Sequence, residues 1–286
     1  MADKIKIEGE KYKAKDRVRA DRTDELYKDI PEGETLMKID GLRVVYRTDD
    51  SETVAVEDFS LDVKKGELIS IIGPSGCGKT TILRCIAGLL QPTTGKITLG
   101  EKECTSPGSD RGMVFQDFAL FPWRTVLQNV EFGMEVAGVP KAERRERAMR
   151  YIKAVGLEKF ANSRIHELSG GMKQRVGIAR AMVMHPAVIL MDEPFGALDA
   201  QTRNIMQDML VKIIQHSDRT ILFVTHSVDE ALYLSDRIVV LSKRPSTIYK
   251  IIDIPWERPR DRTEAEFTHL RKRILSYLED QNVMDN

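Results

Sequence analysis

The stretch that decides the fold runs from Gly73 to Thr80 and reads Gly-Pro-Ser-Gly-Cys-Gly-Lys-Thr. It fits the pattern G-x-x-x-x-G-K-[ST], whose glycines allow successive backbone N–H groups to turn inward toward phosphates. The apolar, β-branched run Glu67–Ile72 precedes it and predicts a strand buried on both faces. The segment after it, TTILRCIAGLL, carries apolar residues at helical spacing. This strand–loop–helix context predicts a phosphate-binding loop, and chance alone would give the pattern in roughly one chain in a hundred.

The side chains of this loop have distinct expected roles. The backbone N–H groups and the N-terminus of the following helix can meet the phosphates. Lys79 can reach the β and γ phosphates, and the Thr80 hydroxyl can hold Mg²⁺. Cys77 is interpreted as a small filler residue and not as a nucleophile. We therefore expect ATP and Mg²⁺ as ligands, and hydrolysis of ATP. The expected ATP-binding residues here are Gly73, Pro74, Ser75, Gly76, Cys77, Gly78, Lys79 and Thr80.

A carboxylate pair follows a second buried run, Val188–Met191. Asp192 and Glu193 alone could be a solvated pair at the end of a strand. With a phosphate loop upstream, both strands can end at the same edge of a sheet, where such sheets bind ligands. Asp192 then suits the Mg²⁺ shell, and Glu193 can polarise the water that attacks the γ-phosphate.

Two more polar residues close buried runs in the same way. His226 follows Ile221–Thr225, and Gln116 follows Met113–Phe115. A lone histidine is usually structural, but here it can contact the γ-phosphate and orient the attacking water. The Gln116 amide oxygen can approach Mg²⁺ and water. Four strand ends that converge on one phosphate predict the catalytic set Glu193, His226, Lys79 and Gln116, and the metal ligands Thr80, Gln116 and Asp192.

The whole chain alternates between strands and helices, which predicts an α/β fold with a mostly parallel sheet between helices. Alternating apolar and polar residues after Thr35 and after Gly95 add an antiparallel β subdomain. A segment rich in Glu, Arg and Lys predicts an inserted helical lobe at about 120–185. A further strand is expected at Ile238–Leu241. Helices are expected at Lys141–Val155, Met172–Met184, Ala200–Gln215 and Val228–Leu234.

Composition excludes several classes of protein. The 286 residues are 42% hydrophobic and 31% charged, and Lys+Arg and Asp+Glu are equal at 44 each, so no nucleic-acid partner is expected. No run approaches the ~18 apolar residues of a membrane span. The charged start, MADKIKIEGEKYKAKD, does not resemble a secretory signal, which favours the cytoplasm. Three cysteines without framework spacing predict reduced thiols.

The two ends are expected to differ from the ATPase domain at 35–254. Residues 1–34 are charged and polar, and they predict an appendage with a helical turn around Asp21 to Asp29, or a solvated tail. Residues 255–286 predict a helical extension that begins with a capping box, Thr263 with Glu266. Its apolar face should dock on the body or on a partner; that face consists of Phe267, Leu270, Ile274 and Leu278.

The stretch Leu168–Arg175, LSGGMKQR, could be an ordinary helix start, but it resembles the signature of ATP-binding cassette (ABC) proteins. It lies between Gln116 and Asp192, as in that family, and the resemblance runs from about Thr35 to Ile254. It implies an ABC-type phosphate-loop ATPase that works as a head-to-tail dimer with two shared ATP sites. Each site would combine the loop, extended to Thr81, with Ser169, Gly170 and Gly171 of the other copy.

The resemblance also implies roles for two residues outside these motifs. Asp199, in Ala197-Leu198-Asp199, would link the two sites across the dimer. Tyr46 would stack on adenine, although it could instead be an edge-strand tyrosine.

Three longer stretches narrow the resemblance to the importer ATPases for nitrate, sulfonate, taurine or bicarbonate. They are FQDFALFPWRTVLQNV, MDEPFGALDAQTR and FVTHSVDEALYLSDRIVVLSKRP. This group implies a homodimer at the cytoplasmic face of the membrane, two permease subunits and an external solute-binding protein. Phe118 to Trp123 would meet the permease. Met172 and Gly196 differ from the residues that are commonest at these positions in the ABC family, but both differences are frequent in this group. The alternative is a soluble ABC ATPase in DNA repair or translation, but such proteins usually carry coiled-coil insertions or two cassettes.

Overall fold

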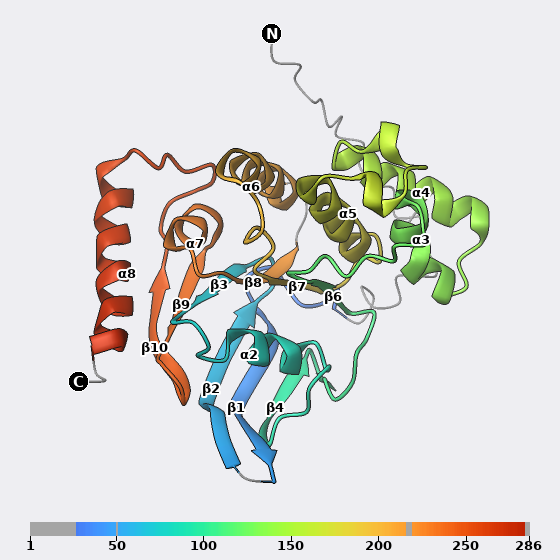
Figure 1. Ribbon diagram of the computed structural model, residues 1–286. Coiled ribbons are helices and arrows are strands. Elements are labelled where there is room, and N and C mark those ends of the chain that lie inside the picture. The colour runs from blue at the N-terminus through green and yellow to red at the C-terminus, as the bar shows by residue number, and fades with distance from the viewer. Residues whose placement is uncertain (1–26, 50, 216–218, 284–286) are drawn as a thin grey trace.

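Five parallel strands form the centre of the molecule in a computed structural model, which describes residues 27–49, 51–215 and 219–283 (Figure 1). In spatial order they are β9, β3, β8, β7 and β6. Their cores are apolar runs buried on both faces, as expected of parallel strands covered by helices. Their bounds are β3 Leu68–Ile72, β6 Arg111–Val114, β7 Val188–Asp192, β8 Thr220–Val224 and β9 Arg237–Leu241.

An antiparallel arm extends the sheet on the β9 side. It consists of β1 (Thr35–Thr48), β2 (Ser51–Lys64), β4 (Thr94–Leu99) and β5 (Lys102–Glu103). One strand, β10 (Ser246–Asp253), joins the two parts because it pairs antiparallel with β9 and parallel with β2. The result is a single ten-stranded sheet.

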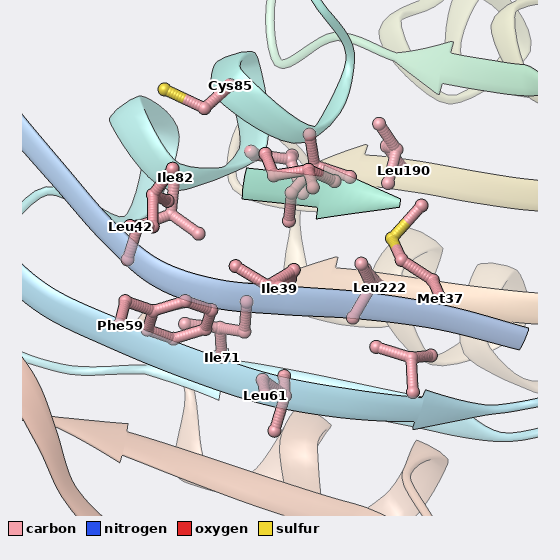
Figure 2. Close-up of a cluster of buried hydrophobic side chains, with 14 of the residues drawn as sticks. Met37, Ile39, Leu42, Phe59, Leu61, Ile71, Ile82, Cys85, Leu190 and Leu222 are labelled. Carbon is pink, nitrogen blue, oxygen red and sulfur yellow. The ribbon is translucent and has the colours of Figure 1, made fainter. Parts of the chain in front are cut away.

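Helix α2 (Lys79–Ile86) packs inside the curl of this sheet. Figure 2 shows Ile82 of α2 beside Leu42 of β1, and Ile39 of the same strand near Leu222 of β8. These side chains belong to one buried cluster that spans the arm and the parallel strands. Because the phosphate-loop motif ends on α2, this cluster fixes the position of the loop relative to both parts of the sheet.

The opposite face of the parallel strands is covered by α5 (Gly170–Met182) and α6 (Ala200–Gln215). Beyond α5 lies the helical lobe, with α3 (Val126–Val136) and α4 (Lys141–Ala154). Two short 3₁₀ turns, Glu158–Phe160 and Ile165–Glu167, lead back to α5. The lobe has its own apolar core, to which α5 contributes Val176, Ala179 and Val183 at its carboxyl end. Helix α5 therefore belongs to both the lobe and the main body.

The last helix, α8 (Ala265–Val283), packs beside α7 (Val228–Leu234) and β9 (Figure 1). Its predicted apolar face is present, since Phe267, Leu270 and Ile274 are buried in this cluster. The predicted capping box is wrong. The Thr263 hydroxyl donates to Asp261 Oδ1 at 2.6 Å instead, and the helix begins two residues later.

The expected turn at Asp21 to Asp29 lies mainly outside the described residues. What is described of the first 34 residues contacts the body: Tyr27 is buried, and Lys65 Nζ donates to the carbonyls of Tyr27 and Ile30. Burial beside Asp110 raises the pKa of Tyr27 to about 12. The segment from Tyr27 therefore packs on the sheet before β1 begins.

Candidate active site

The parallel strands bring four sequence motifs to one edge of the sheet. Strands β3, β8, β7 and β6 are adjacent and parallel, so the residues that follow them lie at a common edge. A pocket of about 550 Å³ opens at this edge. The residues that line it are Tyr46, Ala55, Ser75, Gly76, Gly78, Lys79, Thr80, Thr81, Glu193, His226 and Arg244.

The phosphate-loop segment wraps around the Lys79 ammonium group. Lys79 Nζ donates to the carbonyls of Gly73 and Pro74, each at 2.9 Å. Gly78, the residue before α2, has φ of 107°, a backbone conformation that a side chain would strain. The loop therefore presents a positive charge and the N-terminus of α2 to the same pocket.

Asp192 lies against Thr80, which lines the pocket. The Thr80 hydroxyl donates to Asp192 Oδ1 at 3.0 Å, which joins the end of β7 to the start of α2. Burial raises the pKa of Asp192, and the hydrogen bond from Thr80 opposes that shift. A hydroxyl beside a single carboxylate offers the oxygen ligands that Mg²⁺ takes when substrate phosphates supply the rest.

No described residues form a cluster of three or more acidic, histidine or cysteine side chains that could hold a metal alone.

Glu193 and His226 form the other wall of the pocket. Glu193 Oε2 lies 3.0 Å from His226 Nδ1. Glu193 has φ of 42°, in the left-handed region that a bulky non-glycine side chain rarely adopts. Such strain persists where the surroundings impose it, and it is found most often at functional sites. The two residues have the arrangement of a base and the group that orients it.

A buried carboxylate supports the strand end that carries His226. Glu230 accepts a hydrogen bond from Thr225 Oγ1 at 2.6 Å and another from Gln207 Nε2 at 3.1 Å. Arg203 lies 3.5 Å away and also donates to the Leu198 carbonyl in the loop after Glu193. Burial raises the pKa of Glu230. Glu230 thus connects the β8 end with the loop after β7, a role that was not predicted from the sequence.

Tyr46 lies at the mouth of the pocket. Its side chain is 43% exposed, and its hydroxyl is 3.2 Å from Thr81 Oγ1. A ring beside the phosphate loop that is open on one face leaves room for a base to stack on it. The position supports the predicted adenine contact.

Replacing Tyr46 with alanine should weaken ATP binding by about tenfold, because stacking on a base contributes roughly 1–3 kcal/mol. Tyr46→Phe should bind ATP like the wild type, since the ring remains. Titration with a fluorescent ATP analogue measures both variants. If Tyr46→Phe is as weak as Tyr46→Ala, the Thr81 hydrogen bond is what matters and the stacking interpretation is wrong.

Gln116 does not line the pocket within this chain. It is exposed after β6, the outermost parallel strand, and two residues with left-handed backbone follow shortly, Phe118 (φ 60°) and Ala119 (φ 45°). Arg180 of α5 holds this turn, since its guanidinium donates to the Ala119 carbonyl at 2.7 Å and the Phe118 carbonyl at 3.1 Å.

The signature turn also lies outside the pocket. Ser169 is exposed and caps α5 by accepting a hydrogen bond from Met172 N. Gly171 packs so closely on α6 that a Cβ there would lie 2.6 Å from Thr202 Cγ2. Asp199 caps α6, and hydrogen bonds from Thr202 hold the pKa of Asp199 below its usual range. The predicted contributions of Ser169, Gly170, Gly171 and Asp199 to an ATP site therefore require a second chain.

Two pocket residues were not predicted, Ala55 of β2 and Arg244. The position of Arg244 at the pocket depends on a strand pairing and not on a local motif. The strand that ends at Leu241 runs parallel to β3, so the residues after it reach the edge that carries the phosphate loop.

A phosphate loop, a strand-end carboxylate pair and a strand-end histidine around one pocket define a phosphate-loop ATPase. The sequence matches the ABC transporter family over residues 56–196. It is also 54% identical, over 86% of this chain and 92% of the relative, to an uncharacterised ABC transporter ATP-binding protein of Methanocaldococcus jannaschii. The chain belongs to the ABC transporter family, and it is an ATP hydrolase coupled to transport.

Other relatives carry more specific names. The chain is 45% identical to a nitrate import ATP-binding protein of Synechocystis, over 85% of this chain and 94% of that protein. It is 44% identical to a taurine import ATP-binding protein of Roseobacter denitrificans, over 79% of this chain and 87% of that protein. These matches confirm the resemblance to the importer family that the sequence motifs indicate.

A solved structure confirms the predicted fold class. The post-hydrolysis dimer of an ATP-binding cassette bound to ADP and phosphate aligns with a TM-score of 0.70 and 33% identity. The alignment covers 77% of this chain and all of that one.

Proposed function

We propose that this chain is the ATP-hydrolysing subunit of an importer that takes up a small solute of the nitrate, sulfonate, taurine or bicarbonate type. The observation that carries this proposal is the similarity, over most of both chains, to proteins named for nitrate and taurine import. None of the helices in the described ranges is long and apolar enough to cross a bilayer. The transport path is therefore assigned to two separate permease subunits, and the ATPase to the cytoplasmic face of the membrane.

Two copies are needed for a complete ATP site. The phosphate loop, Glu193 and His226 line the pocket, whereas the Ser169–Gly171 turn of the same chain does not. That turn begins α5, and a helix N-terminus attracts phosphate. In a head-to-tail homodimer the turn of one copy covers the pocket of the other, and Asp199 lies between the two sites. A related cassette was solved as a dimer, which supports this assembly.

Hydrolysis is assigned to the residues that face the pocket. Glu193 accepts the proton of the attacking water, and His226, 3.0 Å from Glu193, orients that water and contacts the γ-phosphate. Lys79 binds the β and γ phosphates. Thr80 and Asp192 would hold Mg²⁺, with Gln116 as the third predicted ligand, and the ion would supply positive charge to neutralise the phosphates. Binding of ATP closes the dimer, and hydrolysis with product release reopens it.

Purification of the chain from its native membrane tests the proposal. Two membrane-spanning proteins should be recovered with it, and ATP-dependent uptake should require an external solute-binding protein. Recovery of ribosomes or DNA ends without a membrane protein would instead support a soluble ABC ATPase. Ligand identification on the co-purified binding protein would assign the solute.

The proposed permease contact is the aromatic turn after Gln116, residues 118–123. Only some residues of this run are exposed. Trp123 is 69% exposed, whereas Phe121 packs on Phe132 with ring centroids 4.5 Å apart. Arg124 lies over the Phe132 ring at 4.9 Å. Phe121 is therefore a support for the turn, and Trp123 is the residue available to a partner.

Replacing Trp123 with serine should abolish most solute uptake in the complete complex while ATP hydrolysis by the isolated subunit is retained. The exposed indole does not line the pocket, and its ring contact within the chain is with Phe121, at 5.7 Å between centroids, so hydrolysis should be spared. Uptake and hydrolysis are measured on the same preparation. Ile251→Ser, at a 42% exposed position on β10, serves as the control and should transport normally. Normal uptake by Trp123→Ser would contradict the assignment of this surface.

A further inference from the structure

Arg244 carries the second positive charge of the pocket, after Lys79. It lies in the turn between β9 and β10, and its guanidinium donates to the Gly76 carbonyl from Nη2 at 2.9 Å and from Nε at 3.2 Å. Gly76 is the middle of the phosphate loop. The guanidinium therefore lies against the loop from the outside, whereas Lys79 is enclosed within it.

The turn that carries Arg244 is rigidly held. Ser246 is buried, and its hydroxyl donates to the Ala55 carbonyl on β2 at 3.2 Å. Ser242 and Thr247 close the turn, since Ser242 N donates to the Thr247 carbonyl at 3.0 Å and Thr247 N donates to Ser242 Oγ at 2.9 Å. Arg244 is thus an exposed side chain on a fixed backbone, which lowers the entropic cost of placing its charge.

We propose that Arg244 is a nucleotide-binding residue that stabilises the phosphate chain. The argument rests on the proposed assignment of this pocket to ATP. Glu193 lines the pocket, and the neighbouring carboxylate Asp192 lies against Thr80. Arg84 and Lys79 both act electrostatically on Asp192, but of these two cations only Lys79 lines the pocket. Arg244 adds a permanent positive charge to the lining of the pocket, against Gly76 of the phosphate loop. The residue has two roles: it holds Gly76 in place and attracts the polyphosphate.

The two roles predict different behaviour for different substitutions. Arg244→Ala loses both the hydrogen bonds and the charge. Arg244→Gln keeps an N–H donor for the Gly76 carbonyl but has no charge. Lys250→Ala removes an exposed cation from the same hairpin, outside the pocket, and is the matched control.

The test measures the affinity of the full chain for ADP, AMP and adenosine by titration calorimetry, with ADP chosen because it is not hydrolysed. We expect Arg244→Ala and Arg244→Gln to weaken ADP binding by about tenfold, the effect of losing one charge-assisted contact. The loss should be smaller for AMP and absent for adenosine. It should also shrink at high salt, because the interaction is between charges near solvent. Lys250→Ala should bind ADP like the wild type.

Two other results would overturn the proposal. ADP affinity of Arg244→Gln equal to wild type would mean that Arg244 only holds the loop. An equal loss for ADP and adenosine would mean that the phosphates are not what it recognises. Lys79→Ala separates this inference from the pocket assignment. If Lys79→Ala also binds ADP normally, the pocket is not the nucleotide site; if it loses binding while Arg244→Ala does not, only the role of Arg244 is wrong.

Discussion

ATP hydrolysis should fall by about a thousandfold when Glu193 is replaced with glutamine, while ATP binding persists. A general base contributes typically 10²–10⁴-fold, and the glutamine amide cannot accept the proton of the attacking water. Glutamine has the same shape and can still hydrogen-bond to His226, now 3.0 Å from the carboxylate. The left-handed backbone at this position is unchanged, so the melting temperature should stay near the wild-type value. Phosphate release measures the rate.

The same variant reports on the proposed dimer. With hydrolysis blocked, ATP should convert Glu193→Gln from monomer to dimer on size-exclusion chromatography, whereas the wild type should return to monomer as ATP is consumed. Glu257→Gln, an exposed carboxylate outside the pocket, is the control and should hydrolyse ATP normally. A Glu193→Gln variant with the wild-type rate would show that another group takes the proton.

Lys79→Ala should lower the affinity for ATP by at least about a hundredfold. The Lys79 ammonium is 7% exposed and bonds to two loop carbonyls at 2.9 Å, so its loss removes a charge and leaves the Gly73 and Pro74 carbonyls without this donor. Charged hydrogen bonds contribute about 1.5–3 kcal/mol each, and a hundredfold change corresponds to about 2.8 kcal/mol. Titration with a fluorescent ATP analogue provides the measurement.

Lys250→Ala, which removes an exposed cation outside the pocket, is the control and should bind ATP with wild-type affinity. Unchanged ATP binding by Lys79→Ala, with a normally folded protein by circular dichroism, would contradict the assignment of the phosphate loop.

Local patterns were sufficient to predict the parallel strands. The run Val188–Met191 is wholly apolar between polar flanks, and β7 extends it by one residue. By contrast, β10 was missed. Its sequence, STIYKIID, is half exposed, and its strand conformation depends on pairing with β9, the strand before it, and with β2, which is far away in the chain. Helix α3 was missed as well, although Thr125 and Gln128 form a capping box at its start.

The candidate site shows the same contrast between residues predicted from local motifs and residues placed by long-range pairing. Thr80, Asp192, Glu193 and His226 meet because parallel strand ends share an edge, which the order of motifs already implies. Arg244 was missed because it depends on the position of β9 beside β3, a long-range pairing. The predicted contribution of Gln116 depends on how the outermost strand approaches the nucleotide, and this chain does not place it at the pocket.

The contacts of Arg180 have a mechanical consequence. They attach the turn at Phe118–Ala119 to the third turn of α5, and Arg164 ties the Trp123 carbonyl to the segment before the same helix. Helix α5 spans about 16 Å between Ser169 and Arg180. A displacement of the Trp123 segment would therefore be transmitted along α5, a rigid helix, to the Ser169–Gly171 turn at its other end. In the proposed assembly, such a displacement would change the gap between the two copies.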